Sequence, residues 1–485
     1  MSDWFDAAEA GDEAAMVNLR RLGLVTNVDE VQDGQTALFV SAGLAHPSVV
    51  RFLLSESANP SFVDSNGHTV LMAAAHGGSG EVISLLLADG VDITTKDNEG
   101  KTAFDYAKLT RKKDALMNLL AVGATPGREK TVLVLGAGFT KAFLPAAPLL
   151  LDNYGMEGTL TRKYRELEYA NDILQDELAR TRPFGAGNVD LERLMTRLDG
   201  GMPYDESHSA VNQLRSLLDD VKLSFLSKLN SAKSGTFHQA ELDALARKCI
   251  NNKITIITFN YDDILDKAIH EAAVGLNTRW SPNRGYGFFC RSSYELEGKT
   301  FGHEHYAEPH TTILKIHGSV NWRTLIGTNT PIKSNDIFHH SKWFSSGAAA
   351  TDAPFDALET QFQAQPFIVP PVLTKASLTQ QPVLQLLWSR AYDALSEADR
   401  VIFVGYSLPV TDIASSTLFK ESMFMMPHHP QVEVVGFAAN ADDQETLKAA
   451  YRRVFPSLDD SQFRFDGGLA WAATFAPPPP PVPTP

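Results

Sequence analysis

Four short apolar runs, each ending in glycine, asparagine or histidine, constrain the fold of this 485-residue chain more than any other feature. The runs are TVLVLGAGFT at 131–140, KITIITFNYDD at 253–263, TTILKIHGSVNW at 311–322 and RVIFVGYSLPVTD at 400–412. Long amphipathic stretches separate them, which is typical of parallel strands in a sheet covered by helices on both faces. Such sheets bind ligands at the carboxyl ends of their strands, so we expect the polar strand ends to converge on one crevice.

Residues 1–125 show a second pattern, a repeat with a period of 33 residues. Glycine-led turn sequences and single leucines both recur at this interval: Gly34, Gly67 and Gly100, and Leu53, Leu86 and Leu119. Within one unit, Ala73-Ala74-Ala75 predicts a first helix of small residues, and Val82-Ile83 lies in a second, apolar helix. Small residues allow neighbouring helix pairs to stack closely, so the pattern predicts a solenoid.

This unit closely resembles the ankyrin repeat, and residues 3–25 are similar to a degenerate first copy. The family's Thr-Pro-Leu-His corner is replaced by Thr-Ala-Leu-Phe at Thr36 and by Thr-Val-Leu-Met at Thr69, so we expect less regular turns. The resemblance implies an all-α solenoid over 1–125 whose concave surface binds a protein. The alternative is that the solenoid only caps the next domain or supports contacts between copies.

Composition excludes several classes of function. A formal net charge of −15 disfavours nucleic acid or an anionic membrane as the main partner. Cys249 and Cys290 are too few for a disulfide framework or a four-cysteine zinc module. The acidic start is unlike a signal peptide, and glycine, lysine and proline interrupt the apolar stretch at 131–151, so we expect a cytoplasmic protein without a membrane span.

A short linker at 126–130 leads into the first apolar run, which ends in Gly136-Ala-Gly138. Glycines permit a tight turn and let N–H groups approach a phosphate, and a following helix adds a favourable dipole. The same glycines also suit a strand-to-helix turn with no ligand. The third glycine of the dehydrogenase fingerprint would fall at Lys141, which disfavours an ordinary dehydrogenase.

Taken in order, GAGFT, TFNYDD, KIHGSVNW and GYSLP resemble the sirtuin-type NAD-binding fold, especially its non-deacetylase branch related to bacterial defence. The resemblance implies an α/β domain over 131–475, Rossmann-like with a mostly parallel sheet. A helical insertion is expected at about 158–250, and a proline-rich extended tail at 476–485. The implied substrate is NAD, and the sequence does not decide between NAD and NADP.

The resemblance also assigns individual residues. It makes His317 the catalytic histidine and puts Asn260 and Asp262 beside the nicotinamide ribose. The implied contacts to the pyrophosphate and adenosine are Gly136, Ala137, Gly138, Phe139, Thr140, Gly405, Tyr406, Ser407 and, as a weaker match, Asn440.

These residue types suit cleavage of the nicotinamide–ribose bond. Positive charge builds on the ribose in the transition state, so the site needs neutral orienting groups and a nearby base. The amide of Asn260 can both donate and accept a hydrogen bond, and an imidazole such as that of His317 takes up protons near neutral pH. The alternatives are structural: an Asx turn at Asn260, a helix cap at Asp262 and a satisfied strand-end histidine at His317.

Departures from the deacetylating sirtuins limit the prediction. The chain has no C-x-x-C pair, so we expect neither zinc nor protein-lysine deacetylation. Three histidines near Cys290, at positions 303, 305 and 310, fit no metal template. The pairs His339-His340 and His428-His429 are interpreted as solvated loop residues.

We therefore expect a regulated NAD glycohydrolase that releases nicotinamide and ADP-ribose. The resemblance implies a role in antiphage defence of the abortive-infection type, in which the ankyrin repeats sense a trigger, plausibly phage-derived, or help to assemble a homo-oligomer. Two other classes stay open. One is a non-catalytic sensor of NAD or ADP-ribose, and the other is ADP-ribosyl or acyl transfer to a recruited protein.

Overall fold

The computed structural model describes residues 2–147, 237–276, 280–292, 311–324, 331–339, 365–369, 381–410, 412–425 and 427–475, with isolated positions between 173 and 229. These residues form two compact units. The first unit comprises Met1–Lys130, Leu395–Arg400 and Lys420–Gln431, and the second comprises Thr131–Ala394, Val401–Phe419 and Val432–Pro485. Most of the expected helical insertion and the whole proline-rich tail lie outside the described residues.

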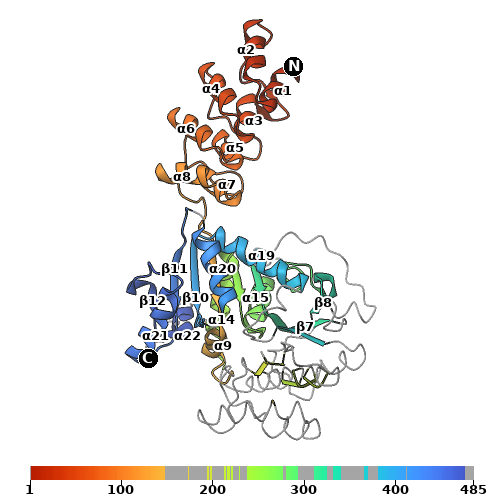
Figure 1. The fold of residues 1–485 in the computed structure, drawn as a ribbon, viewed down its shortest axis with the longest axis vertical. Coiled ribbons are helices and arrows are strands. Elements are labelled where there is room, and N and C mark those ends of the chain that lie inside the picture. The colour runs from red at the N-terminus through yellow and green to blue at the C-terminus, as the bar shows by residue number, and fades with distance from the viewer. Residues whose placement is uncertain are drawn as a thin grey trace, which may run out of the picture. The chain divides into compact units, whose positions relative to one another are not determined.

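The first unit contains a series of helix pairs, labelled in Figure 1. The helices are α1 (Ser2–Ala10), α2 (Glu13–Arg21), α3 (Ala37–Gly43), α4 (Pro47–Ser55), α5 (Val70–Gly77), α6 (Gly80–Ala88), α7 (Ala103–Leu109) and α8 (Lys113–Ala121). A two-stranded ribbon, β1 (Val31–Gln32) and β2 (Gln35–Thr36), precedes α3. The predicted all-α solenoid is confirmed.

Threonines spaced 33 residues apart begin the first helix of successive pairs. The Thr36 and Thr69 hydroxyls each accept the N–H three residues on at 3.2 Å, which satisfies a donor that the first turn leaves open. The predicted leucines of the repeat are fully buried. A Cβ on Gly77 would lie only 2.5 Å from the Gly43 carbonyl oxygen, so a small residue there lets α5 approach α3.

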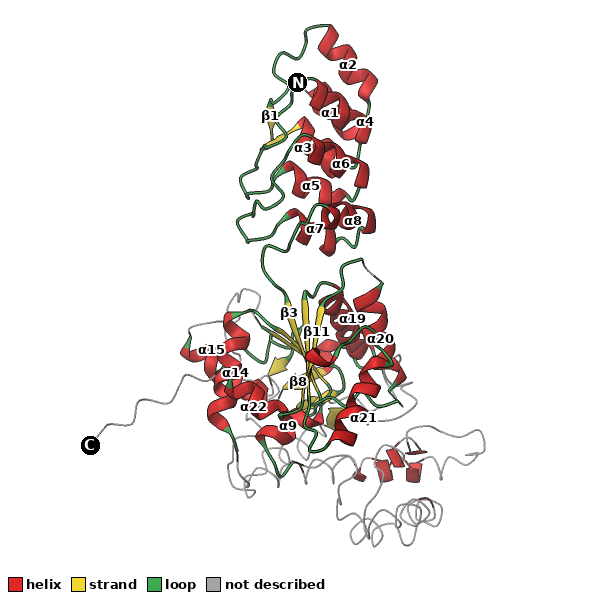
Figure 2. Cartoon of the chain, turned by 90° about the vertical axis from the view of Figure 1, so that its left-hand side faces the viewer, coloured by secondary structure: helices red, strands yellow, loops and turns green. Residues whose placement is uncertain are grey.

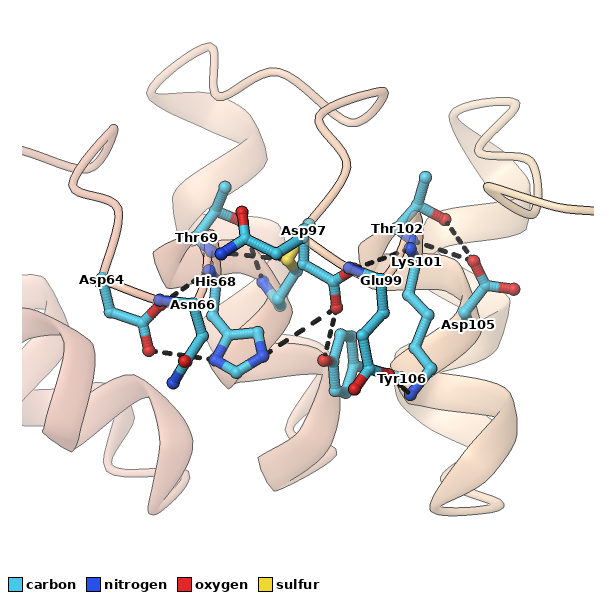
Figure 3. A network of polar contacts seen from close by, with 12 residues as sticks. Asp64, Asn66, His68, Thr69, Asp97, Glu99, Lys101, Thr102, Asp105 and Tyr106 are labelled. Carbon is cyan, nitrogen blue, oxygen red and sulfur yellow. Dashed lines mark hydrogen bonds and ion pairs between the residues drawn. The ribbon is translucent and has the colours of Figure 1, made fainter. Parts of the chain in front are cut away.

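Neighbouring repeats are also joined by polar side chains (Figure 3). Asp97 accepts the Tyr106 hydroxyl at 2.7 Å and the N–H groups of Glu99 and Lys101 at 2.8 Å each. Burial alone would raise the pKa of Asp97, but these donors outweigh it, so its pKa lies below its usual range.

His68 connects the equivalent aspartate of the preceding repeat to this network. Its Nδ1 lies 2.9 Å from Asp64 Oδ2, and its Nε2 lies 3.9 Å from Asp97 Oδ2. The ring also meets Tyr106 edge to face, with 5.6 Å between centroids. These side chains therefore join the turns of two neighbouring repeats.

A second buried polar cluster in the first unit centres on Asp399. Its carboxylate accepts Lys108 Nζ at 2.5 Å, the Lys130 N–H at 2.9 Å and lies 3.0 Å from His428 Nε2. Burial alone would raise the pKa of Asp399, but His428 and Lys108 bring it below its usual range. The interpretation of His428 as a solvated loop residue is wrong, because its ring bonds to Asp399 and meets Phe104 edge to face.

The second unit is built on a six-stranded sheet with the order β12-β11-β10-β3-β4-β6. Its strands are β3 (Thr131–Leu135), β4 (Thr255–Thr258), β6 (Thr312–Lys315), β10 (Arg400–Val404), β11 (Gln431–Val435) and β12 (Phe463–Arg464). The pairings β3–β4, β4–β6 and β11–β12 are parallel. Successive strands extend the sheet from β3 through β4 to β6, and later strands extend it the other way from β10, so the strand order reverses between β3 and β10.

Helices cover both faces of this sheet, as predicted (Figure 2). They are α9 (Ala137–Phe143), α14 (Gln239–Asn251), α15 (Ile264–Gly275), α19 (Pro382–Ser396), α20 (Ile413–Phe424), α21 (Ala441–Arg452) and α22 (Gly467–Ala473). Short 3-10 turns occur at η2 (Ser334–Asp336) and η3 (Asp460–Gln462). Among the described residues, no helix is both long and apolar enough to cross a membrane.

A second, four-stranded sheet was not predicted. Its order is β5-β8-β7-β9, with β5 (Arg291–Ser292), β7 (Gly318–Thr324), β8 (Ile337–His339) and β9 (Gln365–Ile368). The chain turns at Ile316-His317 and continues directly into β7, so Gly318 and Ser319 lie in a strand. His339 is buried in β8, so its interpretation as a solvated residue is also wrong.

Candidate functional site

The loops after β3 and β10 pack backbone against backbone where the strand order reverses. The Gly136 N–H donates to Val404 O at 3.1 Å, and the Gly138 N–H donates to Gly405 O at 2.8 Å. A Cβ on Gly405, which has a φ of +64°, would lie 2.1 Å from Phe139 N. These glycines therefore permit contact between the two loops. They serve packing, as the alternative without a ligand requires, whether or not the loop also binds a phosphate.

The side chains predicted around these loops fall into two groups. Ala137 and Ser407 are exposed, so they are accessible at the loop surface. Phe139 and Tyr406 are buried, and the Tyr406 hydroxyl donates to Asp412 Oδ2 at 2.8 Å. The polar end of Tyr406 is thus held inside the domain.

Asn260 lies at the end of β4 and faces the loop after β3. Its Nδ2 donates to Gly136 O at 2.8 Å and to Thr140 Oγ1 at 2.9 Å. Because a main-chain carbonyl can only accept, the contact with Gly136 fixes which end of the amide carries the hydrogens. Both hydrogens have partners, and within the described part of the chain Oδ1 accepts no hydrogen bond. The amide is therefore oriented with an open acceptor.

Asp262 is joined to Asn260 through the hydroxyl of Thr140. Its Oδ2 accepts the Thr140 hydroxyl at 2.5 Å, and its Oδ1 accepts the N–H of Ile264, the first residue of α15, at 3.3 Å. Asp263 is the N-cap residue of α15, so Asp262 precedes the cap and binds the first helical N–H, in addition to its contact with the predicted site. Asn260, Thr140 and Asp262 form one hydrogen-bonded chain.

His317 is buried in the turn between β6 and β7. Its ring meets Phe259 edge to face with 5.2 Å between centroids, and Phe259 stacks on Tyr406 at 4.4 Å. Gly318 has a φ of +83°, and a Cβ there would lie 2.3 Å from Phe367 O. Aromatic contacts thus connect the ends of β4, β6 and β10, which carry most of the predicted residues.

Asn440 has a clear structural role. It is the N-cap of α21, where its side chain accepts the Asp443 N–H at 2.9 Å. Its described contacts do not reach the other predicted site residues.

Comparison with protein-family models accounts for both units. Three copies of the ankyrin repeat match over residues 4–97 and 40–130, and a SIR2-like domain matches over 254–453. The chain is an ankyrin–SIR2-like fusion. The SIR2-like domain links this chain to NAD, and its match includes the segments that carry Asn260, His317 and Gly405.

Three curated relatives each resemble a segment of the fusion. Protein phosphatase 1 regulatory subunit 12A of Mus musculus is 32% identical over 106 residues, which is 21% of this chain and 10% of the relative. Ankyrin repeat and SAM domain-containing protein 6 of Mus musculus is 36% identical over 91 residues, which is 18% of this chain and 10% of the relative. Transient receptor potential cation channel subfamily A member 1 of Homo sapiens is 32% identical over 122 residues, 25% of this chain and 11% of the relative. The chain thus spans about a tenth of the length of these relatives.

Several residues of the SIR2-like domain that contact the predicted site were missed from the sequence. Thr258 Oγ1 accepts the Asn260 N–H at 3.1 Å, and Trp388 Nε1 donates to Ile316 O at 3.1 Å, one residue before His317. Lys315 is fully buried at the end of β6. The sequence did contain a signal for Lys315, because it is a lysine at the end of an otherwise apolar run. The contact of Trp388 depends on how α19 packs, so no local pattern could have predicted it.

Charge is also buried beside this strand end. Lys315 Nζ lies 3.3 Å from Asp266 Oδ2, in the first turn of α15. Burial raises the pKa of Asp266, and the ammonium of Lys315 opposes that rise. Among the described residues of the fusion, no group of three or more histidine, cysteine, aspartate or glutamate side chains could hold a metal ion.

Proposed function

We propose that the SIR2-like domain is an NAD glycohydrolase. The bond between nicotinamide and the ribose breaks, its electron pair leaves with the nicotinamide nitrogen, and a water oxygen bonds to the ribose carbon. NAD⁺ and water thus give nicotinamide, ADP-ribose and one proton. His317 accepts that proton, and Asn260 orients the water or a ribose hydroxyl.

The orientation of the Asn260 amide is the observation that carries this proposal. Since both Nδ2 hydrogens are bonded within the protein, the group offers Oδ1, which suits a water or hydroxyl that donates a proton. A neutral acceptor held in place also suits a transition state that develops positive charge on the ribose. Asp262 supports this arrangement through Thr140 and lies beside the nicotinamide ribose in the proposal.

The rest of NAD is proposed to lie along the loops after β3, β10 and β11. The exposed Ala137, at the start of α9, and the exposed Ser407 suit contacts with phosphate oxygens. The proposed contacts to the pyrophosphate and adenosine are Gly136, Ala137, Gly138, Phe139, Thr140, Gly405, Tyr406, Ser407 and Asn440, with Phe139 and Tyr406 supporting the loops from the domain interior.

The ankyrin repeats are proposed to regulate this activity. Unrestrained loss of NAD harms the cell that makes the enzyme, so we expect low basal activity in the cytoplasm and activation by a protein trigger. The antiphage role, a phage-derived trigger and a homo-oligomeric state rest on the sirtuin resemblance and on the general use of ankyrin repeats in protein binding.

The test is to incubate the purified chain with NAD alone and to measure nicotinamide and ADP-ribose by chromatography. The wild type should release both in equal amounts, and Asn260→Ala and His317→Ala should each lower the rate by at least about 100-fold. Binding of NAD without release under all conditions would instead support a sensor. Release that requires an added acceptor protein would support ADP-ribosyl or acyl transfer.

A further inference from the structure

Lys315 is a charged side chain in a place where the sheet is otherwise apolar. It is the last residue of β6, follows the buried Ile313 and Leu314, and is itself 0% exposed. Taking an ammonium group out of water is costly, and an apolar side chain of similar volume often stabilises a core as well or better. Burial alone therefore does not explain why a lysine is found here, and the explanation must come from its contacts.

Those contacts join two strand ends. Lys315 Nζ donates to the main-chain oxygen of Asp262 at 2.5 Å and pairs with Asp266 Oδ2 at 3.3 Å. Asp262 lies two residues after Asn260, and Lys315 lies two residues before His317. One ammonium thus connects the segment that carries the proposed orienting amide to the strand that carries the proposed base.

The sheet holds only the start of this segment. In the parallel pairing of β4 with β6, Thr258 and Lys315 are the last paired residues, and the next N–H, that of Phe259, donates to Leu135 O of β3 at 3.0 Å. From Asn260 onwards the chain lies outside the strand pairing. There, Tyr261 O accepts the Val320 N–H at 2.8 Å, and the Asp262 carbonyl is held by Lys315. The carboxylate of the same Asp262 accepts Thr140 Oγ1, which in turn accepts Asn260 Nδ2.

The geometry points to Lys315 as a positioning residue that holds the Asn260 segment against the His317 turn. This inference rests on the proposed function, since it names what keeps the two proposed catalytic residues in register. Lys315 does not touch the reacting atoms in this scheme. Its effect is on orientation, and a misplacement of about 1 Å can lower a rate about 100-fold.

Two variants separate positioning from stability. Lys315→Met leaves Asp266 buried without its partner, which also destabilises the domain. The double variant Lys315→Met/Asp266→Leu removes both charges, so its melting temperature should return toward that of the wild type. Both variants should lose about 100-fold in kcat for nicotinamide release, while KM for NAD changes by less than about threefold. Recovery of both kcat and melting temperature in the double variant would overturn the inference.

Amide hydrogen exchange gives a readout that does not need turnover. Peptides covering 259–264 should exchange faster in both variants than in the wild type. Lys108→Met is a matched control, because it removes a buried lysine that pairs with Asp399, and it should leave exchange at 259–264 unchanged. A wild type that releases no nicotinamide would count against the proposed function alone, whereas unchanged exchange at 259–264 in the double variant would overturn the positioning role.

Discussion

Buried polar side chains act over different distances in the two parts of the fusion. In the ankyrin repeats the side chains of the turns bond within a repeat or to the next one, as when Tyr106 donates to Asp97 nine positions away, although Lys108 pairs with Asp399 outside the repeats. In the SIR2-like domain they join strand ends far apart in the chain: Asn260 and Gly136 are separated by 124 positions, and Thr140 and Asp262 by 122. The repeats therefore use such groups to hold neighbours together, whereas the SIR2-like domain uses them to assemble a site.

The largest expected effect is that of Gly405→Ala. The new Cβ would lie 2.1 Å from Phe139 N at a positive φ, so two main chains must separate, and we expect a loss of about 4 kcal/mol or more from the stability of the SIR2-like domain. Gly23→Ala in the repeats has a similar φ of +71° with nothing within 4 Å, and should cost about 1–2 kcal/mol. Calorimetric unfolding measures both, and equal losses would contradict the role given to close packing of the two loops.

The next effect is that of Asp97→Ala on the repeats. Loss of a carboxylate that accepts three hydrogen bonds in a buried turn should cost about 2–3 kcal/mol in urea unfolding. Asp92→Ala is the matched control, because Asp92 also accepts three hydrogen bonds, from Thr94 and Thr95, but is exposed. Equal losses of stability in the two variants would show that burial of the aspartate does not increase its contribution to stability.

In the second unit, Thr140→Val should change activity more than stability. Valine keeps the shape of threonine but removes the hydroxyl between Asn260 and Asp262, so nicotinamide release should fall about tenfold as the amide loses one of its two anchors. Thr140→Ser keeps the hydroxyl and should stay close to the wild-type rate. A normal rate in the valine variant would mean that Gly136 alone orients Asn260.

A smaller effect on the free energy of unfolding is expected when the pH is lowered. The pKa of Asp399 is lowered in the folded state, so its stabilising contribution is complete above the unfolded pKa of about 4 and is lost as the pH falls through the folded value. The free energy of unfolding should therefore fall more steeply below pH of about 4 in the wild type than in Asp399→Asn. Parallel curves for the two proteins would show that Asp399 contributes nothing to the acid sensitivity.

Much of the fold could be predicted from the sequence because its signals are local. Thr36 and Thr69 begin helices through hydrogen bonds three residues away, and a run such as Thr131–Leu135 carries the apolar pattern of a buried strand. The fold class was confirmed, and so was the ankyrin–SIR2-like organisation.

The errors and omissions came from contacts that no local pattern encodes. His428 pairs with Asp399, 29 positions away, and His339 is buried in β8, a strand of three residues that is too short to stand out in the sequence. The roles of Asn260, Asp262 and His317 stay predictions. Their residue types and their order in the sequence suggested a site. The hydrogen bonds that anchor Asn260 to Gly136 and Thr140 could be recognised only from the structure, because these residues are far apart in the sequence.

The most direct test of the central claim measures NAD binding and NAD cleavage on the same samples of wild type and His317→Ala. Calorimetry gives the dissociation constant, and chromatography gives the rate of nicotinamide release. If the end of β6 carries the base for hydrolysis, the variant should bind NAD within a few fold of the wild type and release nicotinamide at least about 100-fold more slowly. Measurable and equal rates of nicotinamide release in the two proteins would contradict the account.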